Sequence, residues 1–544
     1  MRGLMMDGPL LIQTLLDHAA QYHADTEIVS RTNEGPIHRY TYAEAERRSK
    51  RLANALRRLG IKLGDRVGTL AWNGYRHYEL YFGVSGIGAI CHTINPRLFH
   101  DQLNYIVNHA EDALIFFDLS FAPLIEKLAP GWKPVKHFVA MTDRAHMPSI
   151  GVKNLLCYEE LIAAETPELT WADFEESTAS SLCYTSGTTG NPKGALYSHR
   201  STVLHSFACC SANNTAFAMW DSVCPIVPMF HANAWGVPYS CTMAGSKLVF
   251  PGPNLDGASL QALFESEKVS LMLGVPTVWL GLLKYLEESG KRIDSVNRVL
   301  IGGSAAPPAM IKTFEEKYGV TAFQGWGMTE LSPVGTLGTL KTKFQHLPKE
   351  VQLARKAMQG RPLFGVEMKL VDADGKIQPH DGQARGELFV RGPWVVGGYY
   401  KDEKASRGAV DAEGWFGTGD VATIDPDGYL QLVDRSKDVI KSGGEWISSI
   451  DIENAAIAHP DVAEAAVIGV PHPKWAERPL LIVVPKEGRA PTREAMLAFL
   501  KDKVAKWALP DDVVLLKELP HTATGKILKT KLREIFAGHR LPGA

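Results

Sequence analysis

Short apolar runs alternate with amphipathic segments over the first two thirds of the chain. Residues 67–72 and 113–117 are apolar runs that predict buried strands, and an amphipathic segment lies between them. The pattern returns at 271–275 and 299–301, where each run is followed by a glycine or a proline. Because helices that alternate with strands usually connect parallel strands, we expect α/β domains with mainly parallel sheets.

The clearest helix start is at Thr41. Residues 41–44, Thr-Tyr-Ala-Glu, form a capping box in which the Thr41 hydroxyl accepts from the amide of Glu44 and the Glu44 carboxylate reaches back. Apolar residues at helical spacing follow, and Gly60 ends the pattern. The sequence therefore predicts an amphipathic helix that begins just after Thr41.

The pattern changes at about residue 361. Val-, Leu- and Phe-rich pieces are separated there by Asp-Gly turns, which predicts a small antiparallel sheet or β-barrel over about 361–432. After Ser436 the chain returns to mixed α/β, with strands near 465–470 and 480–484 and a helix near 492–507. We therefore place a domain boundary at about Ser436, which divides the chain into residues 1–435 and 436–544.

Composition limits the classes of partner. At 544 residues the chain is too long for one core, and its 45% hydrophobic and 22% charged residues are typical of globular domains. The 58 Lys and Arg against 60 Asp and Glu give a formal charge of -2. No overall basic field would attract nucleic acid or anionic lipid, so we expect neither as a partner.

The cysteines and the hydropathy indicate the compartment. The seven cysteines include no C-x-x-C pair and none follows residue 241, which argues against a zinc cluster and a disulfide framework. No apolar run approaches the roughly 18 residues that span a bilayer. Residues 9–12 are apolar, but Asp7 precedes them, Gln13 interrupts the run and no cleavage pattern follows. We expect a soluble, cytoplasmic protein with reduced thiols.

A polar, glycine-rich segment follows the apolar run 181–184. Residues 185–194, Thr-Ser-Gly-Thr-Thr-Gly-Asn-Pro-Lys-Gly, offer hydroxyl and amide donors and one compact positive charge, which suits a nucleotide phosphate chain. Lys193 precedes Gly194 and not Ser or Thr, so this is no Walker A motif. A polar surface turn is the alternative.

Two more clusters follow strand-like runs in the same way. They are residues 302–307, Gly-Gly-Ser-Ala-Ala-Pro, and residues 324–330, Gln-Gly-Trp-Gly-Met-Thr-Glu. Ligands of open α/β sheets collect at the carboxyl ends of the strands. We therefore expect these two clusters and residues 185–194 to meet in one cleft.

Taken in order, these signatures resemble those of acyl-CoA synthetases of the adenylate-forming superfamily, which also holds firefly luciferase and nonribosomal peptide adenylation domains. The resemblance covers nearly the whole chain. Residues 92–97 and 441–449 are similar to bacterial long-chain fatty acyl-CoA synthetases, and 3-methylmercaptopropionate-CoA ligases are similar too. The implied fold is α/β and multidomain: a large N-terminal domain of parallel-sheet subdomains plus a small β-barrel, then a small mobile α+β domain.

The resemblance implies two half-reactions. A carboxylate attacks the α-phosphate of ATP and expels pyrophosphate, and the thiol of coenzyme A then displaces AMP. Glu330 would bind Mg²⁺, which prefers a carboxylate together with phosphate oxygens. Trp326 would stack on adenine, and Asp420 would accept the ribose hydroxyls. The positions that match ATP or AMP contacts are Thr185, Ser186, Gly187, Thr188, Thr189, Lys193, Gly302, Gly303, Gln324, Gly325, Trp326, Gly327, Thr329, Asp420 and Arg435.

The candidate residues near the C-terminus match family positions in or beside the mobile C-terminal domain. Lys526 would bridge the acyl carboxylate and the α-phosphate, and with Thr185, Glu330 and Lys441 it completes the implied catalytic set. Lys437 matches the hinge about which the C-terminal domain turns. After that rotation Lys441 would replace Lys526, and Gly443, Gly444 and Trp446 would meet coenzyme A. Taken alone, these lysines would be solvated surface residues.

A further set matches the acyl pocket: His231, Trp235, Gly302, Ser304 and Met328. Trp235 resembles the gate of a fatty-acid tunnel in long-chain enzymes, although an aromatic core residue is the ordinary interpretation of a tryptophan. The leading hypothesis is thus a ligase for a medium- or long-chain fatty acid.

Three alternatives remain open. One is a short-chain or 3-methylmercaptopropionate-CoA ligase with the same chemistry, and another is an adenylation enzyme that loads a carrier protein or a luciferase-like oxygenase. The third is a non-catalytic nucleotide-binding scaffold, which the joint presence of Lys526, Glu330 and Asp420 disfavours. The segment before residue 25 resembles the exchanged N-terminal region of dimeric fatty acyl-CoA synthetases, so we also expect a homodimer.

Overall fold

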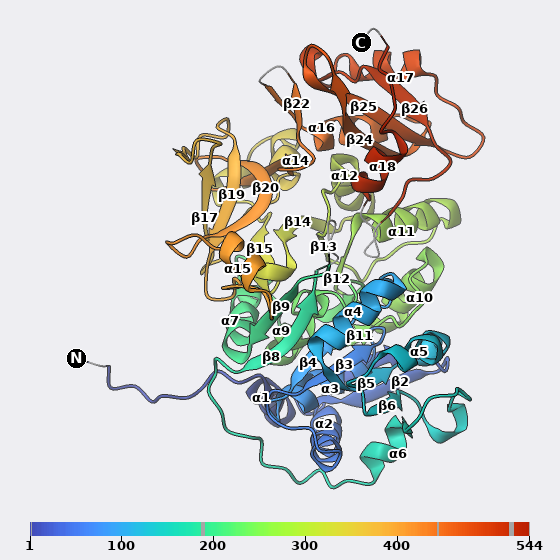
Figure 1. The fold of residues 1–544 in the computed structure, drawn as a ribbon, viewed down its shortest axis with the longest axis vertical. Helices are drawn as coiled ribbons and strands as arrows, with labels where there is room; N and C mark the ends of the chain where they lie inside the picture. The colour runs from blue at the N-terminus through green and yellow to red at the C-terminus, as the bar shows by residue number, and fades with distance from the viewer. Residues whose placement is uncertain (2, 186–190, 443–444, 522–526, 543–544) are drawn as a thin grey trace.

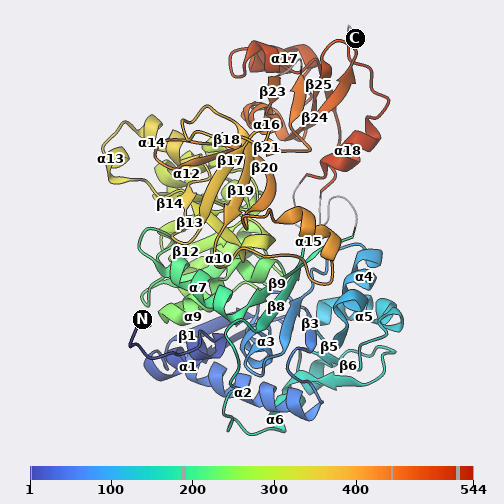
Figure 2. The ribbon, with the colours of Figure 1, turned by 60° about the vertical axis from the view of Figure 1, so that its left-hand side comes forward.

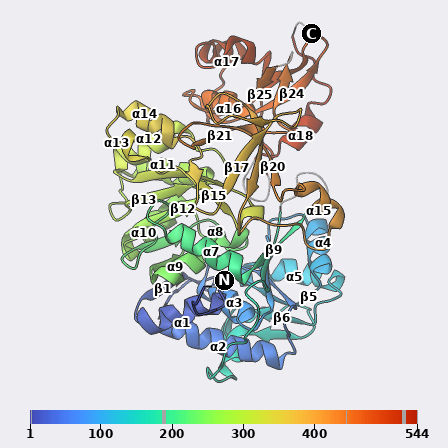
Figure 3. The ribbon, with the colours of Figure 1, turned by 90° about the vertical axis from the view of Figure 1, so that its left-hand side faces the viewer.

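The computed structural model describes residues 1, 3–185, 191–442, 445–521 and 527–542, whose strands form four sheets (Figure 1). The predicted class, mixed α/β with large parallel sheets, is confirmed. Figure 3 shows the two large sheets side by side, with the antiparallel sheet and the C-terminal residues above them.

The first large sheet has seven strands and carries the predicted strands 67–72 and 113–117. All neighbouring strands are parallel except the last pair, which is antiparallel. The order is β7 (Leu155–Cys157), β6 (His137–Ala140), β5 (Asp112–Phe117), β3 (Arg66–Leu70), β4 (Ile90–Thr93), β8 (Ala179–Tyr184), β9 (Gly194–Ser198). The helices between these strands are α3 (Tyr75–Ser85), α4 (His100–Ala110), α5 (Ala122–Leu128) and α6 (Tyr158–Ala163).

The second large sheet has nine strands, parallel in the centre and antiparallel at both ends. Their order is β16 (Arg361–Pro362), β15 (Val334–Leu337), β14 (Thr321–Gly327), β13 (Arg298–Ile301), β12 (Leu271–Gly274), β10 (Ser222–Pro225), β11 (Lys247–Phe250), β1 (Glu27–Arg31), β2 (Ile37–Thr41). Its helices are α7 (His199–Cys210), α9 (Val237–Ala244), α10 (Gly257–Glu267), α11 (Pro276–Ser289), α12 (Pro308–Tyr318), α13 (Thr342–Gln345) and α14 (Lys349–Lys356).

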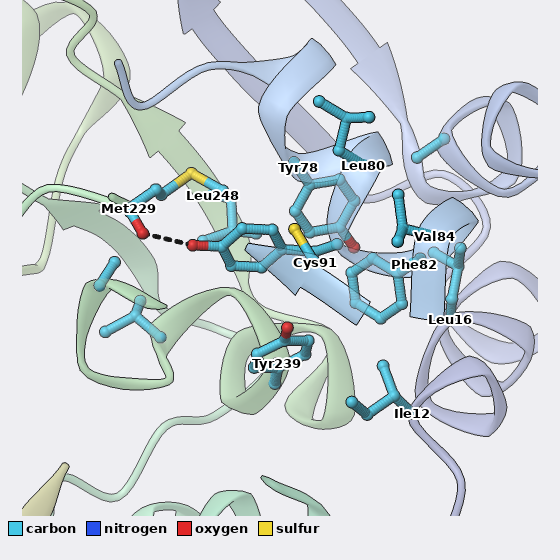
Figure 4. Packing of buried hydrophobic residues seen from close by; sticks show 14 of the residues in the cluster. Ile12, Leu16, Tyr78, Leu80, Phe82, Val84, Cys91, Met229, Tyr239 and Leu248 are labelled. Atoms are coloured by element: carbon cyan, nitrogen blue, oxygen red, sulfur yellow. Dashed lines mark hydrogen bonds between the residues drawn. The ribbon is translucent and has the colours of Figure 1, made fainter. Parts of the chain in front are cut away.

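One apolar core joins the two large sheets. It takes side chains from both sheets and from the helices α1 (Ile12–Tyr22), α2 (Tyr42–Arg58), α3 and α9. Figure 4 shows Tyr78 and Phe82 of α3 packed with Tyr239 of α9 in this core. The Tyr81 hydroxyl donates to the carbonyl of Met229 at 2.5 Å, so α3 also contacts the segment that leads to the site. The core therefore fixes the two sheets relative to each other.

The third sheet is antiparallel and corrects the expected barrel. Its order is β18 (Ile377–Gln378), β17 (Glu367–Val371), β19 (Gly386–Arg391), β20 (Phe416–Ile424), β21 (Leu430–Arg435), with α15 (Glu403–Ala409) before β20. In the described residues the two end strands do not pair with each other, so the sheet is open. It also begins later than residue 361, because Arg361 and Pro362 pair with β15 of the nine-stranded sheet.

The C-terminal residues form a small sheet at one end of the molecule (Figure 2). The expected strands are β24 (Val462–His472) and β25 (Ala476–Pro485), joined by β22 (Ile440–Ser442), β23 (Glu445–Ile447) and β26 (Asp512–Leu515). The helices are α16 (Ser449–Ile457), α17 (Arg493–Leu500) and α18 (Lys529–Ile535). The helix expected near 492–507 thus ends at Leu500, and a short 3₁₀ turn (Lys506–Ala508) follows. The domain boundary at Ser436 stays a prediction.

Among the residues described, no helix is both long enough and apolar enough to cross a membrane.

The capping box is present as predicted and gives a stability test. Glu44 N donates to Thr41 Oγ1 at 3.4 Å, and Thr41 N donates to Glu44 Oε2 at 2.8 Å. We expect Thr41→Ala to lower the free energy of unfolding by about 1 kcal/mol, because an amide at the start of α2 loses its acceptor. Urea unfolding measures this loss. Thr41→Ser keeps the acceptor and should retain most of the stability, and equal losses in both variants would contradict the capping role.

Candidate active site

The three polar clusters meet in a cavity of about 590 Å³. Thr185 follows β8, Gly302 follows β13, and Glu330 lies just beyond β14, so the carboxyl ends of three strands contribute. This is the convergence that the strand order predicts. The predicted residues that line this cavity are Thr185, Lys193, His231, Trp235, Gly302, Gly303, Gly325, Trp326, Gly327, Met328, Thr329, Glu330, Arg435 and Lys437.

Gln324, Ser304 and Asp420 are predicted residues that do not line this cavity. The buried Gln324 side chain accepts from the amide of Ala306 at 2.8 Å and donates to the carbonyl of Ala357 at 3.3 Å. It therefore supports the segment after β13 and does not line the cavity. Ser304 lies on the wall of a second cavity.

The described residues at the two ends of the glycine-rich segment 185–194 are hydrogen-bonded to each other. Thr185 N donates to the carbonyl of Lys193 at 2.9 Å, and Lys193 N donates to Thr185 Oγ1 at 3.2 Å. The Lys193 ammonium lies 4.8 Å from the centre of the Tyr399 ring. These contacts place a cation beside the cavity. Ser186, Gly187, Thr188 and Thr189 lie outside the described residues.

Glu330 is a buried carboxyl beside this cation. Only 6% of the residue is exposed, and Tyr399 donates its hydroxyl to Glu330 Oε1 at 2.8 Å. Burial raises the pKa of Glu330, and the Tyr399 hydrogen bond and the charges of Arg435 and Lys193 oppose that rise. No motif pointed to Tyr399, because its contact with Glu330 joins positions far apart in the chain.

Asp420 connects Trp326 and Arg435. It is 3% exposed, and its two oxygens accept from the Trp326 indole at 2.9 Å and from Arg435 Nε at 2.8 Å. The other side of the indole contacts Gly335, where an added Cβ would lie 2.6 Å from the ring. The position of Trp326 is therefore fixed before any ligand binds. The roles of these residues toward adenine and ribose stay predictions.

The predicted residues after residue 436 differ in whether they lie at the cavity. Lys437 lines the cavity, and burial lowers its pKa. Lys526 lies outside the described residues, but residues 527–530, which follow it directly, line the cavity. Gly443 and Gly444 are also outside the described residues.

Lys441 and Trp446 do not line the cavity. They face each other on the hairpin of β22 and β23, with the Lys441 ammonium 5.9 Å from the indole centre. Arg385, which precedes β19, donates to the Trp446 carbonyl at 2.5 Å and holds this hairpin beside the antiparallel sheet. The structure thus does not bring Lys441 near Glu330 in this arrangement.

A second cavity of about 190 Å³ lies behind Trp235. His231, Trp235 and Gly303 line both cavities, so they form the wall between them. Gly302 packs against this wall, since an added Cβ would lie 2.9 Å from Trp235 Cη2. Most of the remaining wall is apolar, and Arg97 also lines the cavity.

The wall contains a left-handed turn that no sequence pattern indicated. The short helix α8 (Ala232–Trp235) has φ of 43°, 53°, 51° and 58° at its successive residues, and Gly236 follows with φ of 74°. Left-handed helical backbone costs roughly 1–2 kcal/mol per non-glycine residue. Only Asn233 and Gly236 are residues that favour this conformation. The surrounding contacts must therefore hold the turn.

The described residues contain no group of three or more His, Cys, Asp or Glu side chains that could hold a metal ion. Glu330 is the acid that lines the cavity near Lys193. A single carboxylate suits Mg²⁺ only if phosphate oxygens supply other ligands.

Comparisons with known proteins show the family of this chain. Residues 16–400 match the model of the AMP-binding enzyme family, and residues 451–526 match that of the AMP-binding enzyme C-terminal domain. The chain belongs to this family, among its acyl-CoA ligases. It is 52% identical to a 3-methylmercaptopropionyl-CoA ligase of Ruegeria lacuscaerulensis, over 98% of this chain and 99% of the relative.

Two other comparisons extend the match. This acyl-CoA ligase family member is 48% identical to a medium-chain-fatty-acid–CoA ligase of Ectopseudomonas oleovorans, over 98% of both chains. A crystal structure of an anthranilate CoA ligase in complex with anthranoyl-AMP superposes with a TM-score of 0.87, at 25% identity over 98% of this chain and 99% of that one. The resemblance inferred from the motifs is therefore confirmed.

Tyr399→Phe tests the contact that holds Glu330. The loss of the hydroxyl should raise the pKa of Glu330 further, since a donor to the charged form disappears. When the pKa of a carboxyl is higher in the folded than in the unfolded protein, the free energy of unfolding falls as pH rises from the unfolded pKa to the folded pKa. The destabilisation by Tyr399→Phe should therefore be smallest in acid and grow toward neutral pH.

Urea unfolding at several pH values measures this trend. The neighbouring Tyr400→Phe is the matched control, because among the described residues the Tyr400 hydroxyl makes no hydrogen bond to Glu330. A pH-independent loss in Tyr399→Phe would rule out the proposed link to Glu330.

Proposed function

We propose that this acyl-CoA ligase activates a medium-chain fatty acid with ATP and transfers the acyl group to coenzyme A. The observation that carries the choice of acid is the second cavity, which opens a mainly apolar volume behind the Trp235 wall. At about 190 Å³ this cavity has room for several methylene groups, so an alkyl tail of medium length would fit in it.

The first half-reaction needs positive charge and donors around phosphate. Lys193 and Thr185 flank the cavity, and we assign the β- and γ-phosphates of ATP to them and to residues 186–189. Glu330 would hold Mg²⁺, which would neutralise phosphate charge when bound. Burial together with Tyr399 keeps the Glu330 carboxyl oriented toward this place.

Asp420, Trp326 and Arg435 are the proposed nucleoside side of the same cavity. The Asp420 carboxylate retains lone pairs for ribose hydroxyls beside its two protein donors. Lys526 would then neutralise the acyl carboxylate and the α-phosphate as they approach each other. Support for this position comes from residues 527–530, which already line the cavity.

The second half-reaction requires another arrangement of the C-terminal residues. The hairpin with Lys441 and Trp446 lies outside the cavity, so coenzyme A would meet it only after rotation about Lys437. A hinge needs only a few residues that change their backbone dihedral angles. We therefore assign the thiol-transfer step to a second orientation of the chain after residue 436.

One other substrate has a specific observation in its favour. The relative from Ruegeria lacuscaerulensis carries the name of a 3-methylmercaptopropionyl-CoA ligase and is 52% identical to this chain. Its acid is short and would need little of the second cavity. The two substrates therefore differ in whether the volume behind Trp235 is used.

A competition assay separates these substrates. The purified protein is mixed with ATP, Mg²⁺, coenzyme A and equimolar acids from acetate to octadecanoate plus 3-methylmercaptopropionate, and mass spectrometry identifies each acyl-CoA. We expect octanoyl-CoA and its neighbours to dominate. A predominant short or thioether product would favour the second substrate, and pyrophosphate without any thioester would point to a carrier protein as acceptor.

Two lysine variants extend this assay: Lys526→Ala is the test and Lys531→Ala is its control. Lys526→Ala should lower adenylate formation by about a hundredfold or more, as expected when a charge at the transition state is lost. Lys531→Ala removes an exposed lysine paired with Glu534 and should retain activity. Undiminished activity of Lys526→Ala would contradict the adenylation role.

We also propose that the enzyme is a homodimer. The N-terminal residues Leu4, Met5 and Met6 are fully exposed on an arm that projects from the body (Figure 1), and Trp220 is 79% exposed. Exposed apolar side chains on a projecting arm are suited to contact with a second chain. Light scattering at micromolar concentration should give twice the 59.7 kDa chain mass, and a variant without residues 1–8 should be monomeric. A monomeric full chain would refute this proposal.

The state of the thiols supports a reducing compartment. All seven cysteines are free, and six of them are buried. Burial raises the pKa of the Cys183 thiol to about 11, which keeps it protonated and unreactive. We propose that the enzyme acts in the cytoplasm.

A further inference from the structure

The left-handed turn of α8 forms part of the wall between the two cavities. Trp235 is its last residue and His231 precedes it, and both line the two cavities. The direction of these side chains depends on the hand of the turn, because a right-handed turn would project them along different lines. Whatever holds the turn left-handed also fixes the wall.

Asn233 supplies the strongest visible contact. It is 2% exposed, and its amide donates to Ser181 Oγ at 2.9 Å. Its carbonyl oxygen accepts from Thr93 Oγ1 and from Cys183 Sγ, each at 3.4 Å. These three partners belong to β4 and β8 of the seven-stranded sheet, whereas the turn follows β10 of the nine-stranded sheet. Asn233 thus connects the turn to the seven-stranded sheet by hydrogen bonds.

Gly236, the residue directly after the turn, packs against α7. An added Cβ at Gly236 would lie 2.8 Å from His205 Nδ1 of that helix, and φ there is +74°. The other ring nitrogen of His205 accepts from the amide of Val334 at 3.2 Å, and Val334 lines the larger cavity. Burial lowers the pKa of His205 to about 3, so this ring is a neutral acceptor. The turn therefore lies between β8 and α7 and contacts both.

We infer that Asn233 is a positioning residue that fixes the wall between the two cavities and thereby the chain-length preference. The inference rests on the proposed function, in which the acyl tail passes the Trp235 wall. In this structure Asn233 makes its hydrogen bonds while the turn is left-handed. Without them the turn relaxes, His231 and Trp235 move, and acids with long tails are affected more than acids with short tails.

The first test removes a partner that lies outside both cavities. Ser181→Ala deletes the hydroxyl that accepts from Asn233, and Ser181 is fully buried in β8. We expect the ratio of kcat/KM for decanoate to that for butanoate to change by about threefold or more, which is a small part of the roughly 10- to 200-fold that one methylene is worth in an apolar pocket. The matched control is Ser180→Ala, equally buried on the same strand, whose hydroxyl donates to the Tyr197 carbonyl.

The second test changes the turn itself. Asn233→Ala removes the contacts and disfavours the left-handed backbone, while Asn233→Gly removes the contacts but tolerates that backbone. Asn233→Ala should therefore shift the ratio more than Asn233→Gly. Circular dichroism and urea unfolding verify that each variant is folded, and Ser181→Ala decides the outcome if Asn233→Ala does not fold.

Calorimetric binding of decanoate and butanoate gives the same ratio without turnover. A wild-type protein that forms no acyl-CoA would refute the proposed function, and the binding ratio would still test Asn233. If Ser181→Ala and the Asn233 variants lower the values for both acids by one common factor, Asn233 has only a structural role and the inference is wrong. A ratio that changes in Ser181→Ala but not in Ser180→Ala supports it.

Discussion

The buried carboxylate of Asp420 is the contact on which the larger cavity depends. It lies on β20 and accepts from Trp326 on β14 and from Arg435 at the end of β21. One side chain thus joins the nine-stranded sheet to the antiparallel sheet. A carboxylate at 3% exposure is stable only with charged or strong donors, and both donors here also line the cavity. The walls that would receive a nucleotide are therefore positioned by the same hydrogen bonds that hold the sheets together.

The phosphate side of the cavity has the opposite character. Glu330 is buried near two cations, Lys193 and Arg435, and the Tyr399 hydroxyl donates to it. Burial prevails over these partners and raises its pKa, so the described partners do not fully compensate the buried charge. A bound cation is the kind of group that would supply the missing compensation.

Local signals predicted much of this molecule, and contacts between distant residues set the limits. The capping box at Thr41 and the apolar runs at 113–117 and 299–301 depend on neighbouring residues, so their helix and strands appear as expected. The convergence of three clusters followed from a rule about parallel strands. Tyr399 was missed because its partner Glu330 is 69 residues away. The barrel was wrong because turn signals specify hairpins and do not specify whether the end strands pair.

The left-handed turn shows why a wall between two cavities is hard to predict. Ala232, Ala234 and Trp235 at roughly 1–2 kcal/mol each amount to about 3–6 kcal/mol, which is a large fraction of the whole stability of many proteins. Sequence preferences therefore argue against such a turn, and only tertiary contacts from β4, β8 and α7 stabilise it. A right-handed turn of the same residues would avoid this strain. The contacts of Asn233 and Gly236 therefore offset this strain, and they fix the directions of His231 and Trp235 at the same time.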